Sequence, residues 1–379
     1  MSTLRNPGPL GTPVLFGARA ASAARSERSW QRDARRGLAV RLSNGIYCSI
    51  DDWFRLSPWD RYLVAALAHA LSRRQPPVFI GLTALALHGL PLADVPGALH
   101  LRATSAGKSG RERQPLPYLN HRAALDAHVK HYESLGKYPT GHLPVLPDLR
   151  RRWLAEASSR PAQKLPVQPS EKDSGVQGTV LADPVDVAMA DLLAGEPLDV
   201  ATVPADAVKR RHDDATRDLV DRAIARRSTS TQRHRARVAW SFADERAESP
   251  GESLSRARVH QLGFVVPSLQ HAVVDAAGTF VARTDCWWDE INLAGEFDGL
   301  PKYSNAYTDP GETWREVLER EKSREDAIRR TGAGMMRWVW KDLTQPSRFE
   351  KLLLHHGVPR RHDVDSTPAP TGVPFPPTI

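Results

Sequence analysis

The sequence predicts an α+β protein with two ordered parts, and three observations support this fold class. The chain has 379 residues, which is more than one compact core usually requires. Helical periodicity and short runs of β-branched and aromatic residues alternate along it without an internal repeat. Pro, Ser, Lys and Gln dominate residues 130–178, as is typical of a linker or an insertion. We therefore expect one domain before this segment and, after it, a mixed sheet flanked by helices.

These patterns give a set of expected boundaries along the chain. The two ends are rich in proline and are expected to be unstructured. The expected segments are a flexible arm at 1–15, a first domain at 16–129, a mobile linker or insertion at 130–178, bridging helices at 179–232, a second domain at 233–358 and a disordered tail at 359–379.

Charge and cysteine content limit the classes of function. The formal net charge of +8 and the pI near 9.6 favour a polyanionic partner, and residues 1–41 contain eight arginines but only two acidic residues. Cys48 and Cys286 are isolated, which argues against a disulfide scaffold or a structural zinc site and favours a cytoplasmic location. No apolar run approaches the roughly 18 residues of a membrane span. We expect a nucleic-acid contact near the N-terminus and no membrane role.

The first domain is predicted to begin with two short helices. Their patterns cover residues 16–24 and 26–36. Ser26 is a suitable N-cap for the second helix, and Gly37 is a suitable residue to end it.

A β-hairpin is predicted directly after these helices. The runs Leu38–Leu42 and Ile46–Ile50 flank Asn44-Gly45, which is a strong hairpin signal. Two helices followed by a hairpin match the later part of a winged helix-turn-helix, whose second helix lies in the DNA major groove. The candidate DNA-binding residues on or near this helix and wing are Arg28, Arg32, Arg35, Arg36 and Arg41.

Further helices are predicted in the middle of the chain. Their patterns lie at Trp59–Leu71, Thr83–His88, Asp183–Leu193 and Pro204–Arg227, with a short strand at Val78–Gly81. His88 lies between leucines, so we interpret it as a packed, hydrogen-bonded residue and assign it no chemistry.

The candidate active site is a second predicted hairpin. The runs 280–288 and 291–299 are rich in β-branched and aromatic residues and flank the polar pair Asp289-Glu290. A turn centred there would place Asp285 opposite Ala294, with Glu296 on the same face and about 7–8 Å away on the diagonal. Two carboxylates at that separation can share a Mg²⁺ ion.

A third carboxylate, Glu252, precedes the hairpin in a predicted helix that begins at Ser249-Pro250. Taken alone, this residue is explained by helix capping. The predicted order of elements is this helix, a strand at Gln270–Asp275, the strands with Asp285 and Glu296, a helix at Arg315–Arg330 and a strand at Met335–Trp340. This α-β-β-β-α-β order places three acids toward one edge of a sheet.

The motifs in this region resemble the Vsr-like branch of the restriction-endonuclease-like (PD-D/E-x-K) superfamily. They are ESPGES with Arg256, the Gly263–Gln270 segment, Asp285, GEFDG with Lys302-Tyr303, EKSRED and RWVWKDL, spread over roughly Glu248–Leu343. The resemblance implies Mg²⁺ or Mn²⁺ held by Glu252, Asp285 and Glu296, and DNA phosphodiester hydrolysis. Asp298 stands where this superfamily normally has lysine. Lys302 is the nearest candidate for the catalytic cation, and Lys322 is the second.

The N-terminal half is similar to the AbiEi-type antitoxin family, on the motifs RLSNGIYCSI and FIGLTALALHGLPL. That similarity implies a winged-helix DNA-binding transcriptional regulator with a toxin or another protein as a candidate partner.

Two hypotheses therefore remain open. The chain is either a DNA-binding, metal-dependent endonuclease or a non-enzymatic regulator whose nuclease-like domain is degenerate. The sequence lacks GxxxxGK, HExxH and GxSxG motifs, so ATPase, zinc protease and serine hydrolase functions have no support.

Overall fold

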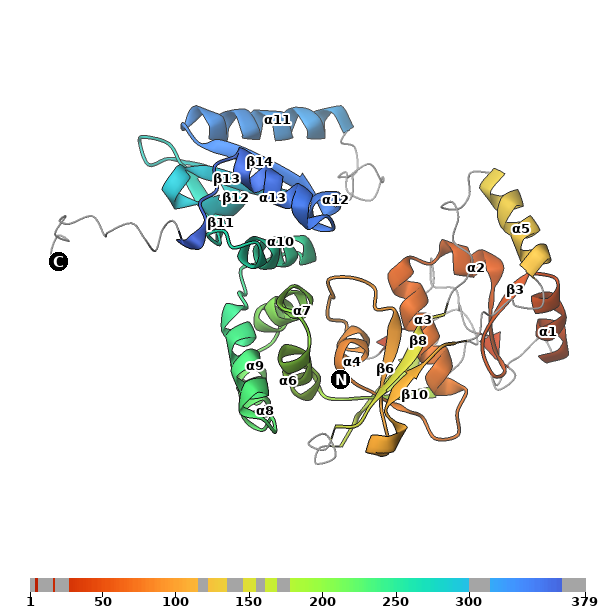
Figure 1. Ribbon diagram of the computed structural model, residues 1–379. Coiled ribbons are helices and arrows are strands. Elements are labelled where there is room, and N and C mark those ends of the chain that lie inside the picture. The colour runs from red at the N-terminus through yellow and green to blue at the C-terminus, as the bar shows by residue number, and fades with distance from the viewer. Residues whose placement is uncertain are drawn as a thin grey trace. The chain divides into compact units, whose positions relative to one another are not determined.

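The computed structural model describes residues 4–5, 16–17, 27–114, 122–134, 146–154, 161–168, 178–299 and 314–362 (Figure 1). The chain divides into two compact units. Unit 1 comprises residues 1–196 and 212–241, and unit 2 comprises residues 197–211 and 242–379. Both units combine helices with mixed sheets, so the α+β class is confirmed. Within the described residues, no helix has the length and apolar character that crossing a membrane requires.

Unit 1 contains a small three-stranded sheet, which is contacted by helices α1 (Glu27–Arg35), α2 (Ile50–Arg55) and α3 (Pro58–Leu71). Strands β3 (Ala39–Ser43) and β4 (Ile46–Ser49) form the predicted hairpin, and Gly45 takes the left-handed conformation that the turn needs, with φ +69°. Helix α1 matches the second predicted helix, and its Trp30 ring stacks on Tyr47 at a centroid distance of 6.2 Å.

The first predicted helix, at residues 16–24, is wrong at its start. Phe16–Gly17 forms strand β2, which pairs with β4 in antiparallel fashion. The pairing satisfies backbone groups on the outer edge of β4, and local helical periodicity does not report this long-range requirement. Residues 18–24 lie outside the described part of the chain.

A seven-stranded mixed sheet forms the centre of unit 1, in the order β1-β9-β10-β5-β6-β8-β7. Its strands are β1 (Leu4–Arg5), β5 (Val78–Phe79), β6 (Ala98–Arg102), β7 (Gly110–Glu112), β8 (Asp148–Arg152), β9 (Gln163–Gln168) and β10 (Gly178–Ala182).

The expected linker at 130–178 is therefore wrong where β8 and β9 lie. Strand β8 is a central strand between β6 and β7, although it reads DLRRR. Its single apolar residue, Leu149, is buried, and Arg111 and Glu112 of β7 pair with Asp148 and Arg151 of β8. Ion pairs between strands stabilise it in place of apolar alternation, so no hydrophobic pattern could reveal it.

Unit 1 also contains the helices α4 (Gly81–Leu87), α5 (Arg122–Ser134), α6 (Val185–Gly195), α8 (Asp214–Ala225) and α9 (Ser230–Phe242). Helices α3 and α4 pack on the seven-stranded sheet, α6 packs on α4, and α8 packs on α6, whereas α2 contacts the small sheet. The patterns at Trp59–Leu71 and Thr83–His88 correspond to α3 and α4. His88 is packed as expected, because its Nε2 hydrogen-bonds the Asp183 carbonyl at 2.8 Å and burial lowers its pKa.

The single helix expected at Pro204–Arg227 is wrong, because two helices occupy this range. Helix α7 (Leu198–Arg211) ends before Asp213, whose carboxylate accepts the Thr216 N–H at 3.0 Å and starts α8. The boundaries expected at 179–232 also differ from the structure. Helix α7 belongs to unit 2, whereas α6 and α8 belong to unit 1.

Unit 2 has the predicted α-β-β-β-α-β order. Its four-stranded sheet runs β11-β12-β13-β14, with β13 and β14 parallel and the other pairs antiparallel. Besides α7, the elements are α10 (Pro250–Gln261), β11 (Ser268–Val274), β12 (Phe280–Trp288), β13 (Leu293–Asp298), α11 (Trp314–Arg330), β14 (Gly334–Val339), α12 (Trp340–Leu343) and α13 (Pro346–His355).

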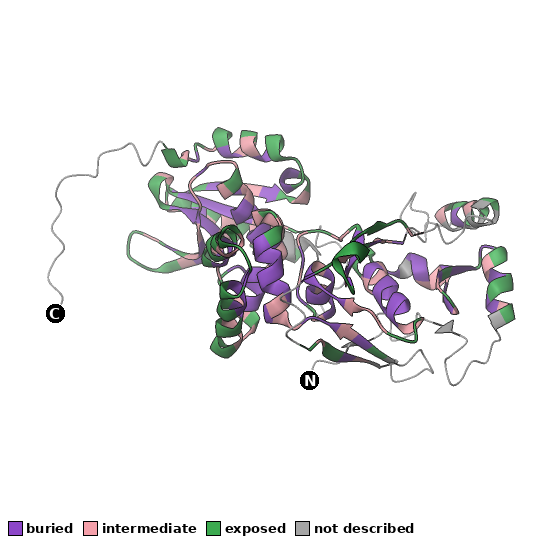
Figure 2. Cartoon of the chain, turned by 60° about the horizontal axis from the view of Figure 1, so that its bottom comes forward, coloured by how far each residue is buried: buried purple, intermediate pink, exposed green. Residues whose placement is uncertain are grey.

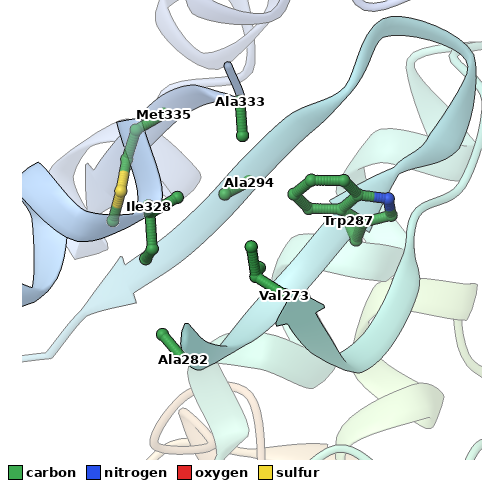
Figure 3. Close-up of a cluster of buried hydrophobic side chains, with 7 residues drawn as sticks. All are labelled: Val273, Ala282, Trp287, Ala294, Ile328, Ala333 and Met335. Atoms are coloured by element: carbon green, nitrogen blue, oxygen red, sulfur yellow. The ribbon is translucent and has the colours of Figure 1, made fainter. Parts of the chain in front are cut away.

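Helices α10 and α11 lie on opposite sides of this sheet (Figure 1). The predicted N-cap of α10 is confirmed, because Ser249 Oγ accepts the Glu252 N–H at 3.2 Å. Buried residues follow the strands and the helix faces packed on them (Figure 2). One such cluster joins the sheet to Ile328 of α11 through Trp287, Ala294, Met335 and their neighbours (Figure 3). This packing fixes where the acidic residues of the sheet lie.

Candidate functional site

Asp285 and Glu296 lie on the β12–β13 hairpin, as predicted, but in a different register. The ladder pairs Ala294 with Trp287, and not with Asp285 as predicted. The prediction was wrong by two residues because the connection is longer than a two-residue turn: a 3₁₀ turn and a left-handed residue occupy positions 289–292. An even shift keeps each side chain on its face. Continuing the ladder by two residues places Asp285 directly across from Glu296.

A row of polar residues crosses the sheet at this level. Glu296 of β13 pairs with Arg337 of β14. On the other side, the ladder between β11 and β12 pairs the residues that flank Asp285 with those that flank Gln270. Gln270 has φ 54°, a left-handed conformation that is strained for a non-glycine residue. Such strain is concentrated at functional sites in proteins, and here it occurs in the row that contains both acidic residues.

Helix α10 brings the third carboxylate, Glu252, to this row. The helix approaches β13 so closely that a Cβ on Gly251 would lie 2.0 Å from the Phe297 ring. Glu252 is 5% exposed, and its Oε2 accepts the Gln270 Nε2–H and the Glu248 backbone N–H, both at 2.9 Å. Glu252 thus contributes to the start of its helix and also contacts the strained residue of the row.

Electrostatics link Asp285 to Glu252. The pKa of Asp285 is raised to about 6. Burial is the largest cause of the increase, and the negative charge of Glu252 is the second. Two interactions oppose the increase: Asp285 Oδ2 accepts the Phe297 N–H at 3.0 Å, and the Arg324 charge acts on the same carboxylate. The fold thus holds the half-buried Asp285 and the buried Glu252 near each other although their charges repel.

Glu296 is in a different environment, because arginines hold both of its oxygens. Arg324 Nη2 of α11 lies 2.6 Å from Oε1, and Arg337 Nη2 lies 3.1 Å from Oε2. Glu296 is 6% exposed, and burial raises its pKa while the two arginines lower it. The carboxylate is therefore already neutralised by side chains of unit 2.

The donor set fits a divalent cation in part. Mg²⁺ is commonly held by one or two carboxylates together with water, and Glu252 and Asp285 provide such a pair. Both oxygens of Glu296 lie within ion-pair distance of an arginine, but only Oε2 accepts a hydrogen bond, and Oε1 is buried without one. Over the described residues, no group of three or more His, Cys, Asp or Glu side chains is arranged to hold a metal ion. A three-carboxylate site would therefore require the arginine pairs to open.

The expected catalytic lysines have no described contact with this row. Lys302 lies outside the described residues. Lys322 is exposed on α11. Asp298 Oδ1, at the position where the resemblance leads one to expect lysine, lies 3.6 Å from Arg337 Nη1. Among the described residues, the positively charged side chains that contact this row are therefore arginines.

The tryptophans of unit 2 mainly form core. Trp287, Trp288 and Trp338 are buried, and Trp338 Nε1 donates to Ser255 Oγ at 2.6 Å. Trp340 is half-buried and packs edge-on against Phe297. The three buried rings are thus not available for stacking on unpaired bases.

The five candidate DNA-binding arginines all lie in unit 1. Arg28, Arg32 and Arg35 are exposed on α1, Arg36 is exposed just after it, and Arg41 is exposed on β3, where its Nη2 donates to Asn44 Oδ1 at 2.6 Å. Helix α1 and the hairpin form one small body through Trp30 and Tyr47. The positive side chains thus share one folded element.

Three residues of the site were not identified from the sequence: Gln270, Arg324 and Arg337. All three occur in motifs that carry the nuclease resemblance, so a signal was present. Their roles depend on contacts between elements that are 18 to 41 residues apart in sequence, such as Gln270–Glu252 and Arg337–Glu296.

Comparisons with family models, with curated proteins and with solved structures find no match to this chain.

Proposed function

We propose that the protein binds DNA and that unit 2 is a Mg²⁺- or Mn²⁺-dependent endonuclease domain that hydrolyses phosphodiester bonds. One observation carries the proposal. Glu252 and Asp285 are brought together from a helix and a strand although burial and mutual repulsion raise the Asp285 pKa to about 6. Burial of two carboxylates that repel each other costs stability, and strongly shifted carboxylates are concentrated at functional sites.

The residues of unit 2 have distinct tasks in this proposal. Glu252 and Asp285 hold the divalent cation, which when bound activates water and polarises the phosphate. Gln270 orients Glu252 through its 2.9 Å hydrogen bond. The Phe297 N–H orients Asp285. Glu296 is the third acid of the row, and Arg337 beside it supplies the positive charge that lysine supplies in the superfamily pattern.

The winged-helix-like element of unit 1 supplies DNA affinity in this proposal. The supporting observation is the exposure of Arg28, Arg32, Arg35, Arg36 and Arg41 on one helix-and-hairpin body. Contacts of this kind with phosphates are independent of sequence and sensitive to salt.

The test is cleavage of supercoiled and linear DNA by the purified protein with Mg²⁺ or Mn²⁺. We expect Asp285→Asn and Glu252→Gln to lower the cleavage rate by at least about 100-fold, because each removes an anionic ligand. Glu290→Gln is the matched control, since Glu290 is exposed on the connection between β12 and β13. Cleavage that is unchanged in both site variants would refute the nuclease proposal.

A second candidate function is a non-enzymatic, antitoxin-like DNA-binding regulator. The observation that favours it is that Glu296 is held at both oxygens by arginines while Asp298 replaces the usual lysine. In that case unit 2 contacts DNA or a protein partner such as a toxin without cutting. Salt-dependent binding of a duplex, together with no Mn²⁺ binding detectable by calorimetry, would select this candidate over the first.

A further inference from the structure

We infer that Arg324 is an exchangeable counter-ion, which occupies the cation position of the Asp285–Glu296 pair until a divalent cation replaces it. This inference rests on the proposed function of unit 2 and concerns how its metal site is formed. The starting point is that Asp285 and Glu296 face each other across β12 and β13 and that one guanidinium acts on both. Arg324 Nη2 lies 2.6 Å from Glu296 Oε1, and its charge also acts on Asp285.

The position of Arg324 differs from that of a surface ion pair. Glu296 is 6% exposed, so its charge requires a partner in the native structure. Arg324 Nη2 also donates to the Arg283 carbonyl on β12 at 2.5 Å, which directs the guanidinium over the sheet at the level of the acidic row. Asp285 and Glu296 would hold a divalent cation in the place that the guanidinium occupies. The guanidinium and the metal ion are thus alternatives for one site.

Arg324 is also free to leave without unfolding its helix. Its side chain is 37% exposed, so solvent or a phosphate group can reach the guanidinium. The next turn of α11 carries Ile328, which is completely buried in the cluster against the sheet and anchors the helix. A rotamer change of one long side chain is therefore sufficient, while the backbone of α11 stays in place.

Arg337 has a different environment and is expected to remain bound. Besides its 3.1 Å contact with Glu296, Arg337 has ion pairs of 3.4–3.8 Å with Glu325, Asp298 and Glu321. This arginine is surrounded by carboxylates and retains partners if Glu296 turns toward a metal ion. Arg324 has one carboxylate within ion-pair distance among the described residues, so its release costs less.

The experiment is calorimetric titration of the full-length protein with Mn²⁺ alone, in parallel with the cleavage assay. Arg324→Gln and Arg324→Met remove the competing charge and are expected to bind Mn²⁺ at least about tenfold more tightly than the wild type. Arg324→Lys keeps the charge and is expected to remain close to the wild type. Arg330→Gln is the matched control, since Arg330 is exposed on the same helix.

The double variant Asp285→Asn, Arg324→Gln shows whether the tighter Mn²⁺ binding occurs at this site. We expect the double variant to lose the gain in Mn²⁺ affinity. Affinity that is equal to or below wild type in both neutral variants overturns the inference, and so does a gain that persists in the double variant. Absence of Mn²⁺ binding in every variant overturns it as well. Tighter binding without DNA cleavage supports the inference and refutes the nuclease proposal. Cleavage by the wild type without tighter Mn²⁺ binding in the variants supports the nuclease proposal and overturns the inference.

Discussion

The ring of Phe297 lies directly over Gly251, so closely that a Cβ at residue 251 would be 2.0 Å from a ring carbon. This contact joins the first turn of α10 to β13, and it involves the residue next to Glu252 and the residue next to Glu296. The Phe297 N–H in turn hydrogen-bonds Asp285. The separation of the three acidic residues is therefore set by the packing of one glycine against one aromatic ring.

Gly251→Ala is expected to move α10 away from β13. The alanine methyl group cannot fit, so either the helix or the ring must shift, and overpacking of this kind typically costs about 1–3 kcal/mol. Chemical denaturation should show the loss in free energy of unfolding. Gly299→Ala is the control, because a Cβ there meets nothing within 4 Å. Equal stability of the two variants would mean that the contact is not as close as described.

The buried pair of Asp206 and Arg256 is expected to be essential for the stability of unit 2. Arg256 Nη2 donates to both Asp206 oxygens, at 2.9 and 3.1 Å, and the two side chains are 5% and 0% exposed. Asp206→Ala leaves a buried charge without its partner, which costs about 3–5 kcal/mol. By contrast, the exposed arginine at 246 is paired with Asp244, and Arg246→Ala should cost less than about 1 kcal/mol.

A double variant separates burial of charge from loss of packing at this pair. Asp206→Leu combined with Arg256→Met removes both charges, so we expect it to unfold at a higher denaturant concentration than Asp206→Ala. A double variant that is less stable than the single one would show that the hydrogen bonds of Arg256, including the one to the Phe242 carbonyl, dominate the energy.

The sequence predicted unit 2 well because its signals are local. The N-cap at Ser249, the apolar runs of the hairpin and the helical period of α11 each act within one element. The register of Asp285 was missed because a left-handed Asn292 lengthens the connection, and although Asn favours that conformation among non-glycine residues, the sequence does not show that this Asn adopts it. The partners of Glu296 were missed for a related reason: Arg324 and Arg337 reach it from elements brought together only by the tertiary fold.

Asp285 is expected to make the metal-free protein less stable as pH rises. Its native pKa of about 6 lies above the ordinary aspartate value of 3.8, so between these values the folded state binds more protons than the unfolded state. Stability is therefore lost as pH rises from about 4 to 6, and the loss is complete above 6. Two pKa units correspond to roughly 3 kcal/mol at most.

The measurement is denaturant unfolding of the wild type and Asp285→Asn in the presence of a chelator, from pH 4 to pH 7. Asparagine carries no charge but keeps an oxygen that can accept the Phe297 N–H. The variant should gain stability relative to the wild type across this range and be the more stable protein at pH 7. A difference that does not change with pH would show that Asp285 ionises normally in the folded protein.

DNA binding by unit 1 is expected to depend on the exposed arginines at and after the end of α1. If Arg35 and Arg36 each contact one phosphate, replacing both by alanine removes two released counterions, and the negative slope of log K against log salt becomes shallower by about 1.8. Fluorescence anisotropy with a labelled duplex at several salt concentrations measures this slope. Arg113→Ala is the control, because Arg113 is exposed at the end of β7, outside the helix-and-hairpin body. If the slopes of the double variant and the control are the same, the surface that contacts DNA lies elsewhere on the protein.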